Sequence, residues 1–307
     1  MLLQGRFRIL FLYDVAEDLD LAKIGALLGP RAGPAKPAFP RRTPEYVRFE
    51  RAPIVEPCDP VTLPTGERLT ASIKYYAFAA VVLQFEAPFE CDWDALLPQA
   101  SRWMDAPDLE PYARELVRRH LDRVTPAVTR PTGDWLQEGY LVIHLEEIRQ
   151  VDSRPIAAKE LLTAHAEYVM QLVRGETEPL APRAADELLA SSLSYYPTDL
   201  VVVRSSGALV YDRSEDADAT IQVLEYAKIQ LLEFRYYDSY MSQVLADVYT
   251  AFERKRNVLV SRWSLPRAAK RLNTIRLDVM DLTERIDNAI KFVSDIYYAR
   301  VYQMAAA

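Results

Sequence analysis

Glycine is scarce in this chain, and its scarcity argues against a common class of nucleotide site. The 307 residues include nine glycines, about 3% where soluble proteins average ~7%. Loops that cradle phosphate need glycines at close spacing, because the backbone must turn sharply and approach the phosphate oxygens. The nine glycines form no such cluster. We therefore expect neither a P-loop nor a Rossmann-type nucleotide fold.

Cysteine and histidine are equally sparse. Cys58 and Cys91 stand alone, without the spacing of a disulfide framework or a zinc site, so both are expected to be ordinary thiols. The three histidines form no pair at metal-binding helical spacing. His144 and Glu146 share one strand face and could hold a metal or a proton, but a half-buried histidine beside a solvated glutamate is the favoured interpretation. We predict no catalytic residue, no metal and no cofactor.

Long apolar runs are absent as well. The longest, around residues 77–85, is about half of the ~20 residues that a membrane-spanning helix needs. Arg6, Arg8 and Asp14 interrupt the apolar N-terminus, so it does not resemble a signal peptide. The net charge of -7 gives no general attraction for nucleic acid or anionic lipid. These features predict a soluble, cytoplasmic chain.

The first 215 residues mix strand and helix patterns without a regular βαβ rhythm. Strands are predicted near 6–13, 46–51, 68–85, 139–148, 200–203 and 208–211, the last two as a hairpin with Gly207 at positive φ. Helices are predicted after Asp18 and at 93–104, 111–124, 157–173 and 184–193. Nine prolines fall within 30–64, which predicts a loop or linker. The fold class is α+β, with an N-terminal mixed α/β domain over 1–215.

The last quarter of the chain carries the sharpest pattern. Apolar residues follow steps of three and four along two segments: Leu224, Ala227, Leu231, Phe234, Met241, Leu245, Val248 and Phe252 in the first; Leu272, Ile275, Val279, Leu282, Ile286, Ala289, Val293 and Ile296 in the second. Two helices need such stripes to bury a common seam. Residues 216–307 are therefore predicted to form a long antiparallel, coiled-coil-like helical hairpin that serves association, including self-association into a homo-oligomer.

One stripe position is a carboxylate, Asp238. A buried charge needs a partner, and Arg235, one turn earlier, or Arg276, on the facing helix, could supply it. Buried polar residues often fix the register of coiled helices. Asp238 is expected to be such a register pin; the alternatives are an anion or ligand site and simple exposure.

The turn between the two helices is strongly basic. Eight basic residues and no acidic residue fall between positions 254 and 276: Arg254, Lys255, Arg256, Arg262, Arg267, Lys270, Arg271 and Arg276. With Trp263 beside them they suit an anionic membrane surface or an RNA backbone. The alternative is a solvated hairpin end that pairs with acidic groups of its own chain. We expect residues 254–271 of this set to form the partner-binding site.

The helical segments also resemble a known family. Ala227–Asp238 (AKIQLLEFRYYD) and Arg271–Val279 (RLNTIRLDV) are similar to the required-for-meiotic-nuclear-division (Rmd/Sif-type) family. That resemblance implies an α+β region followed by a helical hairpin, no established enzymatic activity, a bacterial or organellar setting, an association with mitochondrial membranes and organelle gene expression, and a membrane anchor beyond residue 307.

These observations favour a non-enzymatic scaffold or adaptor that self-associates through its hairpin and works at or near a membrane. The alternative is an RNA- or ribosome-associated factor that binds through the basic turn. A third possibility, a small-molecule hydrolase built on the α+β domain, has no motif to support it. No small-molecule substrate is identified.

Overall fold

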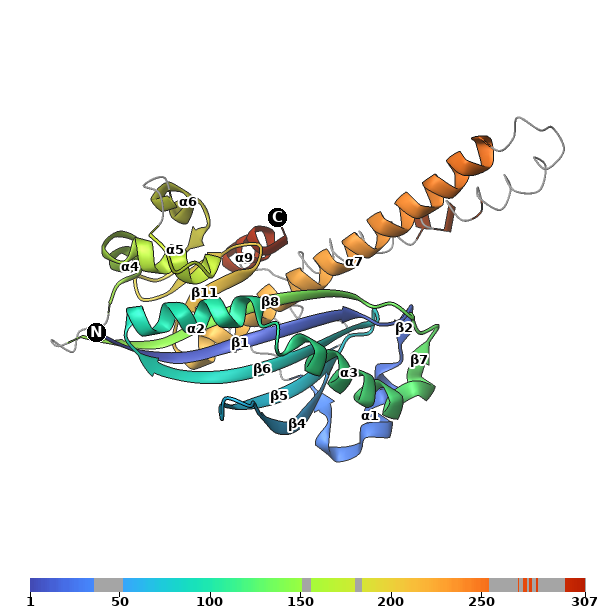
Figure 1. The fold of residues 1–307 in the computed structure, drawn as a ribbon, viewed down its shortest axis with the longest axis horizontal. Coiled ribbons are helices and arrows are strands. Elements are labelled where there is room, and N and C mark those ends of the chain that lie inside the picture. The colour runs from blue at the N-terminus through green and yellow to red at the C-terminus, as the bar shows by residue number, and fades with distance from the viewer. Residues whose placement is uncertain are drawn as a thin grey trace.

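The computed structural model describes residues 1–35, 52–150, 156–179, 184–253 and 296–306, together with residues 270, 273, 274, 276, 277 and 280. Over these residues the fold is built on one large, mainly antiparallel sheet (Figure 1). The strand order is β3-β4-β5-β6-β1-β8-β11-β10-β9, and β8 and β11 form its parallel pair. The strands are β1 (Leu2–Asp14), β3 (Gly33–Pro34), β4 (Ile54–Thr62), β5 (Arg68–Tyr75), β6 (Ala80–Cys91), β8 (Leu136–Arg149), β9 (Ser192–Leu193), β10 (Leu200–Val203) and β11 (Gly207–Tyr211). A small second sheet pairs β2 (Asp18–Leu19) with β7 (Val128–Thr129).

Both faces of the large sheet are covered, because its central strands are apolar on both sides. On β1, Phe7, Ile9 and Phe11 pack into one core, and Leu10 and Leu12 into another. The first core lies under the helices α1 (Leu21–Leu28), α2 (Trp93–Asp105), α3 (Glu110–Val124), α4 (Ala158–Ala164), α5 (Ala166–Arg174) and α6 (Ala184–Ala190). The second lies under α7 (Ser214–Glu253) and α9 (Ile296–Ala306). The result is three layers, with the sheet in the middle.

Several sequence predictions are confirmed. The mixed α/β class is found, and the strand prediction at 68–85 corresponds to β5 and β6. Leu141, Ile143 and Leu145 of β8 face the first core, as the alternation predicts. Both cysteines are free thiols. No helix among the described residues is long and apolar enough to cross a membrane.

The proline-rich segment was predicted wrongly at its C-terminal end. Pro57 and Pro60 lie inside β4, which pairs with β5. Proline lacks an N–H and is tolerated at sheet edges and bulges, and β4 is close to the edge, with its register shifted between Cys58 and Val61. The strand predicted at 46–51 lies outside the described residues.

Three local predictions need correction. The helix predicted after Asp18, for which Asp18 was the expected N-cap, is capped by Asp20 instead, whose carboxylate accepts from the backbone N–H of Lys23 at 3.0 Å. The helix predicted at 157–173 is broken at His165 into α4 and α5. Gly207 lies in a strand and does not have positive φ. A Cβ there would lie 2.9 Å from Cε of Met104, the end of a flexible side chain, and 3.1 Å from the backbone oxygen of Leu141.

Candidate interaction site on the long C-terminal helix

Helix α7 is 40 residues long, or about 60 Å at ~1.5 Å per residue. Its N-terminal half lies on the sheet and buries Ala217, Ile221, Leu224, Ala227, Ile229 and Leu232. Its C-terminal half extends beyond the sheet (Figure 1). The predicted domain boundary at 215 therefore falls where α7 begins, and the first half of α7 shares a core with the sheet.

The N-terminal half of α7, which we call the seated half, buries a carboxylate against the strands. Glu225 is fully buried. Its Oε2 lies 2.5 Å from Nζ of Lys74, and its Oε1 accepts from the hydroxyl of Tyr76 at 2.6 Å. Burial, together with the Glu225 charge, raises the pKa of Tyr76 well above its ordinary value. A buried ion pair with these additional bonds fixes the position of the helix on the sheet.

A second group of charges lies one turn farther along α7. Lys228 is buried, its Nζ lies 4.7 Å from the ring centroid of Tyr140, and it donates to the backbone oxygen of Ser205 at 3.2 Å. Burial lowers the pKa of Lys228, and the charge of Glu138 partly offsets this lowering. Arg235 donates from Nη1 to Oε2 of Glu138 at 2.8 Å. Arg235 is the last α7 residue for which the structure gives an ion pair with the sheet.

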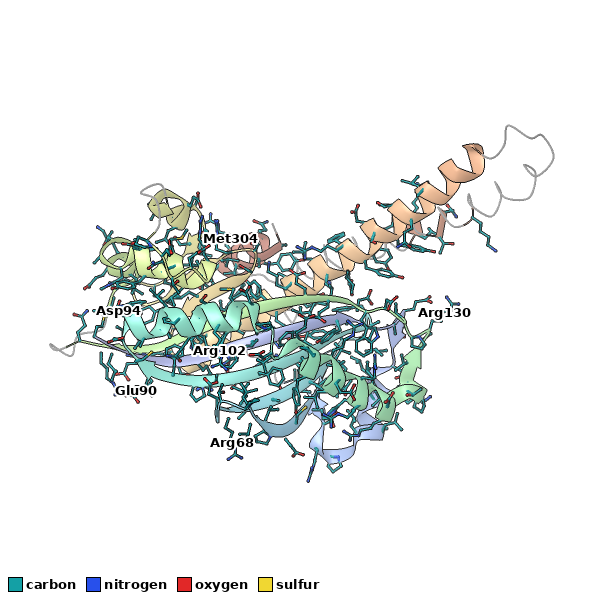
Figure 2. All side chains as sticks on the ribbon, viewed as in Figure 1. Arg68, Glu90, Asp94, Arg102, Arg130 and Met304 are labelled. Carbon is teal, nitrogen blue, oxygen red and sulfur yellow. The ribbon has the colours of Figure 1, made fainter. Side chains whose placement is uncertain are left out.

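Beyond this point the apolar stripe leaves the core. Leu224 and Ala227 are fully buried, whereas Phe234, Met241 and Leu245 are 39%, 36% and 46% exposed. Steps of seven and four place these three on one face of the helix. Side chains stand out from this half of α7 beyond the sheet (Figure 2). We call these three residues the projecting stripe.

The chain also returns to the seated half of α7. Helix α9 packs on it, with the rings of Tyr226 and Tyr302 6.4 Å apart. Tyr298, Val301 and Ala305 of α9 are buried in the same core. The two ends of the predicted hairpin therefore lie beside each other, while most of residues 254–295 lies outside the described residues.

The predicted register pin is placed differently from the expectation. Asp238 is exposed, not buried. Arg235 pairs with Glu138 of β8. Arg276 is exposed. Residues 281–295, which the seam also requires, lie outside the described residues, so a contact of Asp238 with the facing helix remains a prediction.

The predicted partner-binding set lies mostly outside the described residues. Lys270 is described and exposed. The others, Arg254, Lys255, Arg256, Arg262, Trp263, Arg267 and Arg271, are not among the described residues, so the basic binding surface remains a prediction.

The favoured interpretation, a half-buried His144 beside a solvated glutamate, needs correction, because Glu146 is partly buried and pairs with Arg6 at 2.6 Å. His144 is fully buried, and its Nε2 lies 3.1 Å from the backbone oxygen of Asp212. Burial lowers its pKa, with the charges of Arg8 and Arg6 adding to the effect. Nδ1 of His144 is 3.8 Å from Oε1 of Glu146. No group of three or more potential metal ligands occurs in the part of the chain that the structure describes.

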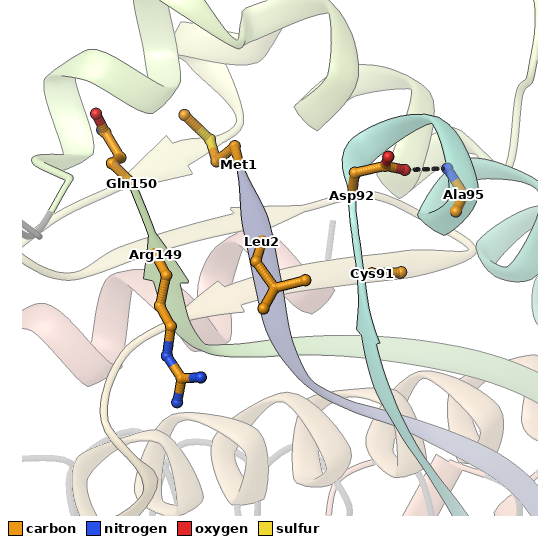
Figure 3. A pocket seen from close by; sticks show the side chains of 7 residues that line it. All are labelled: Met1, Leu2, Cys91, Asp92, Ala95, Arg149 and Gln150. Carbon is orange, nitrogen blue, oxygen red and sulfur yellow. Dashed lines mark hydrogen bonds between the residues drawn. The ribbon is translucent and has the colours of Figure 1, made fainter. Parts of the chain in front are cut away.

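A surface hollow lies elsewhere, where β1 begins and β6 and β8 end, beside α2 (Figure 3). Its volume is about 640 Å³, and it is lined by Met1, Leu2, Cys91, Asp92, Ala95, Arg149 and Gln150. Asp92 is used as the N-cap of α2 and accepts from the backbone N–H of Ala95 at 2.9 Å. Arg149 is paired with Glu147 at 2.9 Å. The polar groups of Asp92 and Arg149 are thus already bonded within the fold.

Reasoning from the sequence missed the buried ionic contacts of α7. Glu225 and Lys228 belong to none of the patterns from which the sites were predicted. A signal was present, because both lie between apolar residues on a segment that is buried on more than one side. Their partners, Lys74 and Tyr140, are far away in the sequence and could not have been identified from spacing.

The comparisons agree with the sheet domain rather than with the hairpin. Residues 4–218 match the family described as "Uncharacterized protein MJ0711, N-terminal domain". Uncharacterized protein MJ0711 of Methanocaldococcus jannaschii is 24% identical over 189 residues, which cover 62% of this chain and 55% of that protein. The chain thus matches only about half the length of this relative. No solved structure matches the chain.

These matches correct the resemblance to the required-for-meiotic-nuclear-division family, which was wrong. That resemblance rested on short runs in amphipathic helices, where apolar spacing recurs in unrelated proteins. The new match covers the strands and helices from β1 to the first turn of α7. The expectations of a mitochondrial setting and a membrane anchor, which the resemblance carried, lose that support. The chain belongs to the family of the MJ0711 N-terminal domain.

Proposed function

We propose that this protein is a non-enzymatic scaffold that self-associates through its C-terminal helices. The observation that carries the proposal is the change of environment along α7. One continuous apolar stripe is buried on the sheet at Leu224 and exposed at Phe234, Met241 and Leu245. Apolar side chains repeated along one helix face favour packing against a second helix.

The partner that we propose is the same segment of a second copy. Within one copy, α9 packs on the seated half of α7, while each residue of the projecting stripe is at least 36% exposed. The tyrosines of α7 add rigid apolar area, and the rings of Tyr236 and Tyr240 stack with centroids 6.2 Å apart. Two such helices could bury their projecting stripes against each other, which is the isologous arrangement common in homodimers.

The test uses a variant of the projecting stripe with Phe234, Met241 and Leu245 changed to glutamate. The matched control is Leu189→Glu on α6, an exposed leucine (58%) far from α7 in the sequence. Both proteins should keep their fold, because exposed substitutions usually change stability by within about 0.5 kcal/mol each. Light scattering should show a smaller mass for the stripe variant alone. Equal masses for all three proteins would contradict the proposal.

A second candidate function rests on the basic segment. Eight basic and no acidic residues between positions 254 and 276 of a chain with net charge -7 suit an anionic partner. We propose that this segment brings the scaffold to an anionic membrane surface, with RNA or a ribosome as the alternative. Flotation with anionic and neutral liposomes, beside an RNA gel shift at two salt concentrations, separates the two. RNA binding should weaken steeply with salt.

A further inference from the structure

A cluster of polar side chains joins strand β4 to helix α3, on the face of the sheet opposite α7. Glu56 and Cys58 are two residues apart on β4, so their side chains point to the same side. His120 and Arg123 are three apart on α3 and share one helix face. We call these four residues the Cys58 cluster.

A buried carboxylate is at the centre of the Cys58 cluster. Glu56 is 5% exposed. It accepts from Nη1 of Arg123 at 2.6 Å and from the hydroxyl of Tyr75 at 3.1 Å, and its Oε2 lies 2.8 Å from Nδ1 of His120. Burial alone would raise the pKa of Glu56, but the hydrogen bonds and charges of His120 and Arg123 lower it below its ordinary value. Glu56 is therefore a fixed anion that orients the imidazole.

The other nitrogen of this imidazole faces the thiol. Nε2 of His120 lies 3.8 Å from Sγ of Cys58, within hydrogen-bonding distance for sulfur. When Nδ1 donates its proton to Glu56, Nε2 of the neutral ring offers its lone pair to the thiol. Thiol, imidazole and carboxylate thus lie in series, which is the order found in activated nucleophiles.

Cys58 lies at an irregular part of β4. It is partly exposed and packs against the first core, and Asp59 and Pro60 after it are exposed. The register shift between Cys58 and Val61 places an irregularity of β4 beside the thiol. On its outer side, β4 pairs with β3 through Val55 and Ile54 alone among the described residues. A small disulfide would have to reach the sulfur from this side of β4.

The surroundings of Cys58 decide how it can react. Burial raises the pKa of the thiol to about 12, and the charges of Glu56 and Asp59 add to this, while a backbone hydrogen bond with Ile73 and the charge of Arg123 oppose it. The resting group is thus a protonated thiol. The imidazole has to accept the proton while the sulfur attacks, which is general-base catalysis and not prior formation of a thiolate.

We propose that Cys58 is a histidine-activated thiol that exchanges with small disulfides and so carries a reversible mixed disulfide. Sγ of Cys58 attacks one sulfur of the reagent; a new S–S bond forms as the reagent's S–S bond breaks. The thiol proton passes to Nε2 of His120 and then to the leaving thiolate. One disulfide is consumed and one is formed, so no further oxidant is needed.

The chemistry favours a disulfide over an acyl group as the partner of Cys58. Acyl transfer needs free donors where negative charge develops on the carbonyl oxygen. Around Glu56, Nη1 of Arg123 and the hydroxyl of Tyr75 donate to its carboxylate and are not free for this role. Disulfide exchange leaves the negative charge on the departing sulfur, which His120 can protonate.

Cys91 provides a matched control. It is also half-buried in the same sheet, and burial raises its pKa. Its Sγ accepts from Nε2 of Gln99 at 3.7 Å, and the contacts given for it include no imidazole. The variant Cys91→Ser reports the reaction of Cys58, and Cys58→Ser reports that of Cys91. Each is made with and without His120→Gln.

The probe is 2,2′-dithiodipyridine, a neutral disulfide whose reaction is followed by absorbance and by intact mass. At neutral pH Cys58 should react at least about tenfold faster than Cys91, since a positioned general base typically contributes more than that. His120→Gln should remove the advantage and leave the rate of Cys91 unchanged. Equal rates for the two cysteines, or no effect of His120→Gln on Cys58, would overturn the proposal.

A pH profile keeps the test decisive if His120→Gln unfolds the chain. With His120 intact, the rate of Cys58 should rise with pH by clearly less than tenfold per unit, because attack does not wait for the thiolate to form. A thiol without a base reacts only as thiolate, so its rate should rise tenfold for each pH unit over the same range. That second profile for Cys58 would contradict the assignment.

Discussion

Single buried charges determine how α7 sits on the sheet. Glu225 reaches Lys74 and Tyr76 on the strand side, and Lys228 lies over Tyr140. Removing one member of a buried pair is costly, because the other charge remains desolvated without compensation. The contacts of α7 therefore depend on these residues more than on its surface charges.

We expect Glu225→Ala to lower the free energy of unfolding by about 3 kcal/mol, because the ammonium of Lys74 would lose its buried partner. The control is Glu17→Ala, which breaks the pair of Glu17 with Arg130 on the surface (Figure 2), where the side chains are 58% and 79% exposed. That loss should stay below about 1 kcal/mol. Urea denaturation measures the free energy of unfolding of both variants. Similar losses would show that Glu225 is not essential for holding α7 on the sheet.

Asp14, at the end of β1, leads to a prediction about how stability depends on pH. It is 7% exposed, and burial raises its pKa from 3.8 to about 6. Above pH 6 the buried group is ionised, at a cost of up to about 3 kcal/mol relative to the unfolded chain. As pH falls from 6 towards 4, the folded state takes up the proton first, so this cost disappears.

Asp14→Asn should therefore stabilise the protein at pH 7, and its advantage should shrink as pH falls to 4. Thermal unfolding at the two pH values measures the change. Asp134→Asn, at an exposed position, should show no such difference between them. If Asp14→Asn destabilises equally at both pH values, the carboxylate makes a favourable contact that burial does not reveal.

At the scale of elements, the central strand pair depends on one close approach. Gly5 of β1 lies where the register with β8 shifts. A Cβ at Gly5 would lie 2.0 Å from the backbone oxygen of His144 and 2.8 Å from Cζ of Phe89. The backbone oxygen cannot move without disturbing the β1–β8 ladder, so this position requires glycine.

Gly5→Ala should lower the free energy of unfolding by more than about 2 kcal/mol through overpacking. Gly139→Ala on β8 is the matched control, since a Cβ there would have no atom within 4 Å. Its effect should be within about 1 kcal/mol of zero. Chemical denaturation measures both; a tolerated Gly5→Ala would mean that the two strands can separate locally at little cost.

Most elements could be predicted from the sequence, because their patterns are local. The alternation of β8 and the apolar faces of α2 and α3 indicate their positions directly. The β4 strand was missed because Pro57 and Pro60 are typical of loops, and only the sheet edge explains their tolerance. The contact of Glu225 with Lys74 spans 151 residues, and no local pattern encodes such a distance.

At the scale of the whole molecule, a three-layer body carries a helix that extends beyond it (Figure 1). The apolar stripe of α7 predicted a buried seam along its full length, yet the stripe is exposed from Phe234 onward among its described side chains. Periodicity shows that a face is apolar but cannot tell whether the sheet, the returning chain or a second copy covers it. The scaffold proposal assigns that face to a second copy.

Sedimentation equilibrium of the unmodified chain tests this central claim most directly. The chain mass is 35.1 kDa. With self-association through the projecting stripe, the weight-average mass should rise with concentration to at least twice the chain mass at tens of micromolar. A mass equal to that of one chain over the whole range would contradict the scaffold account, because the projecting stripe would then have no second copy to cover it.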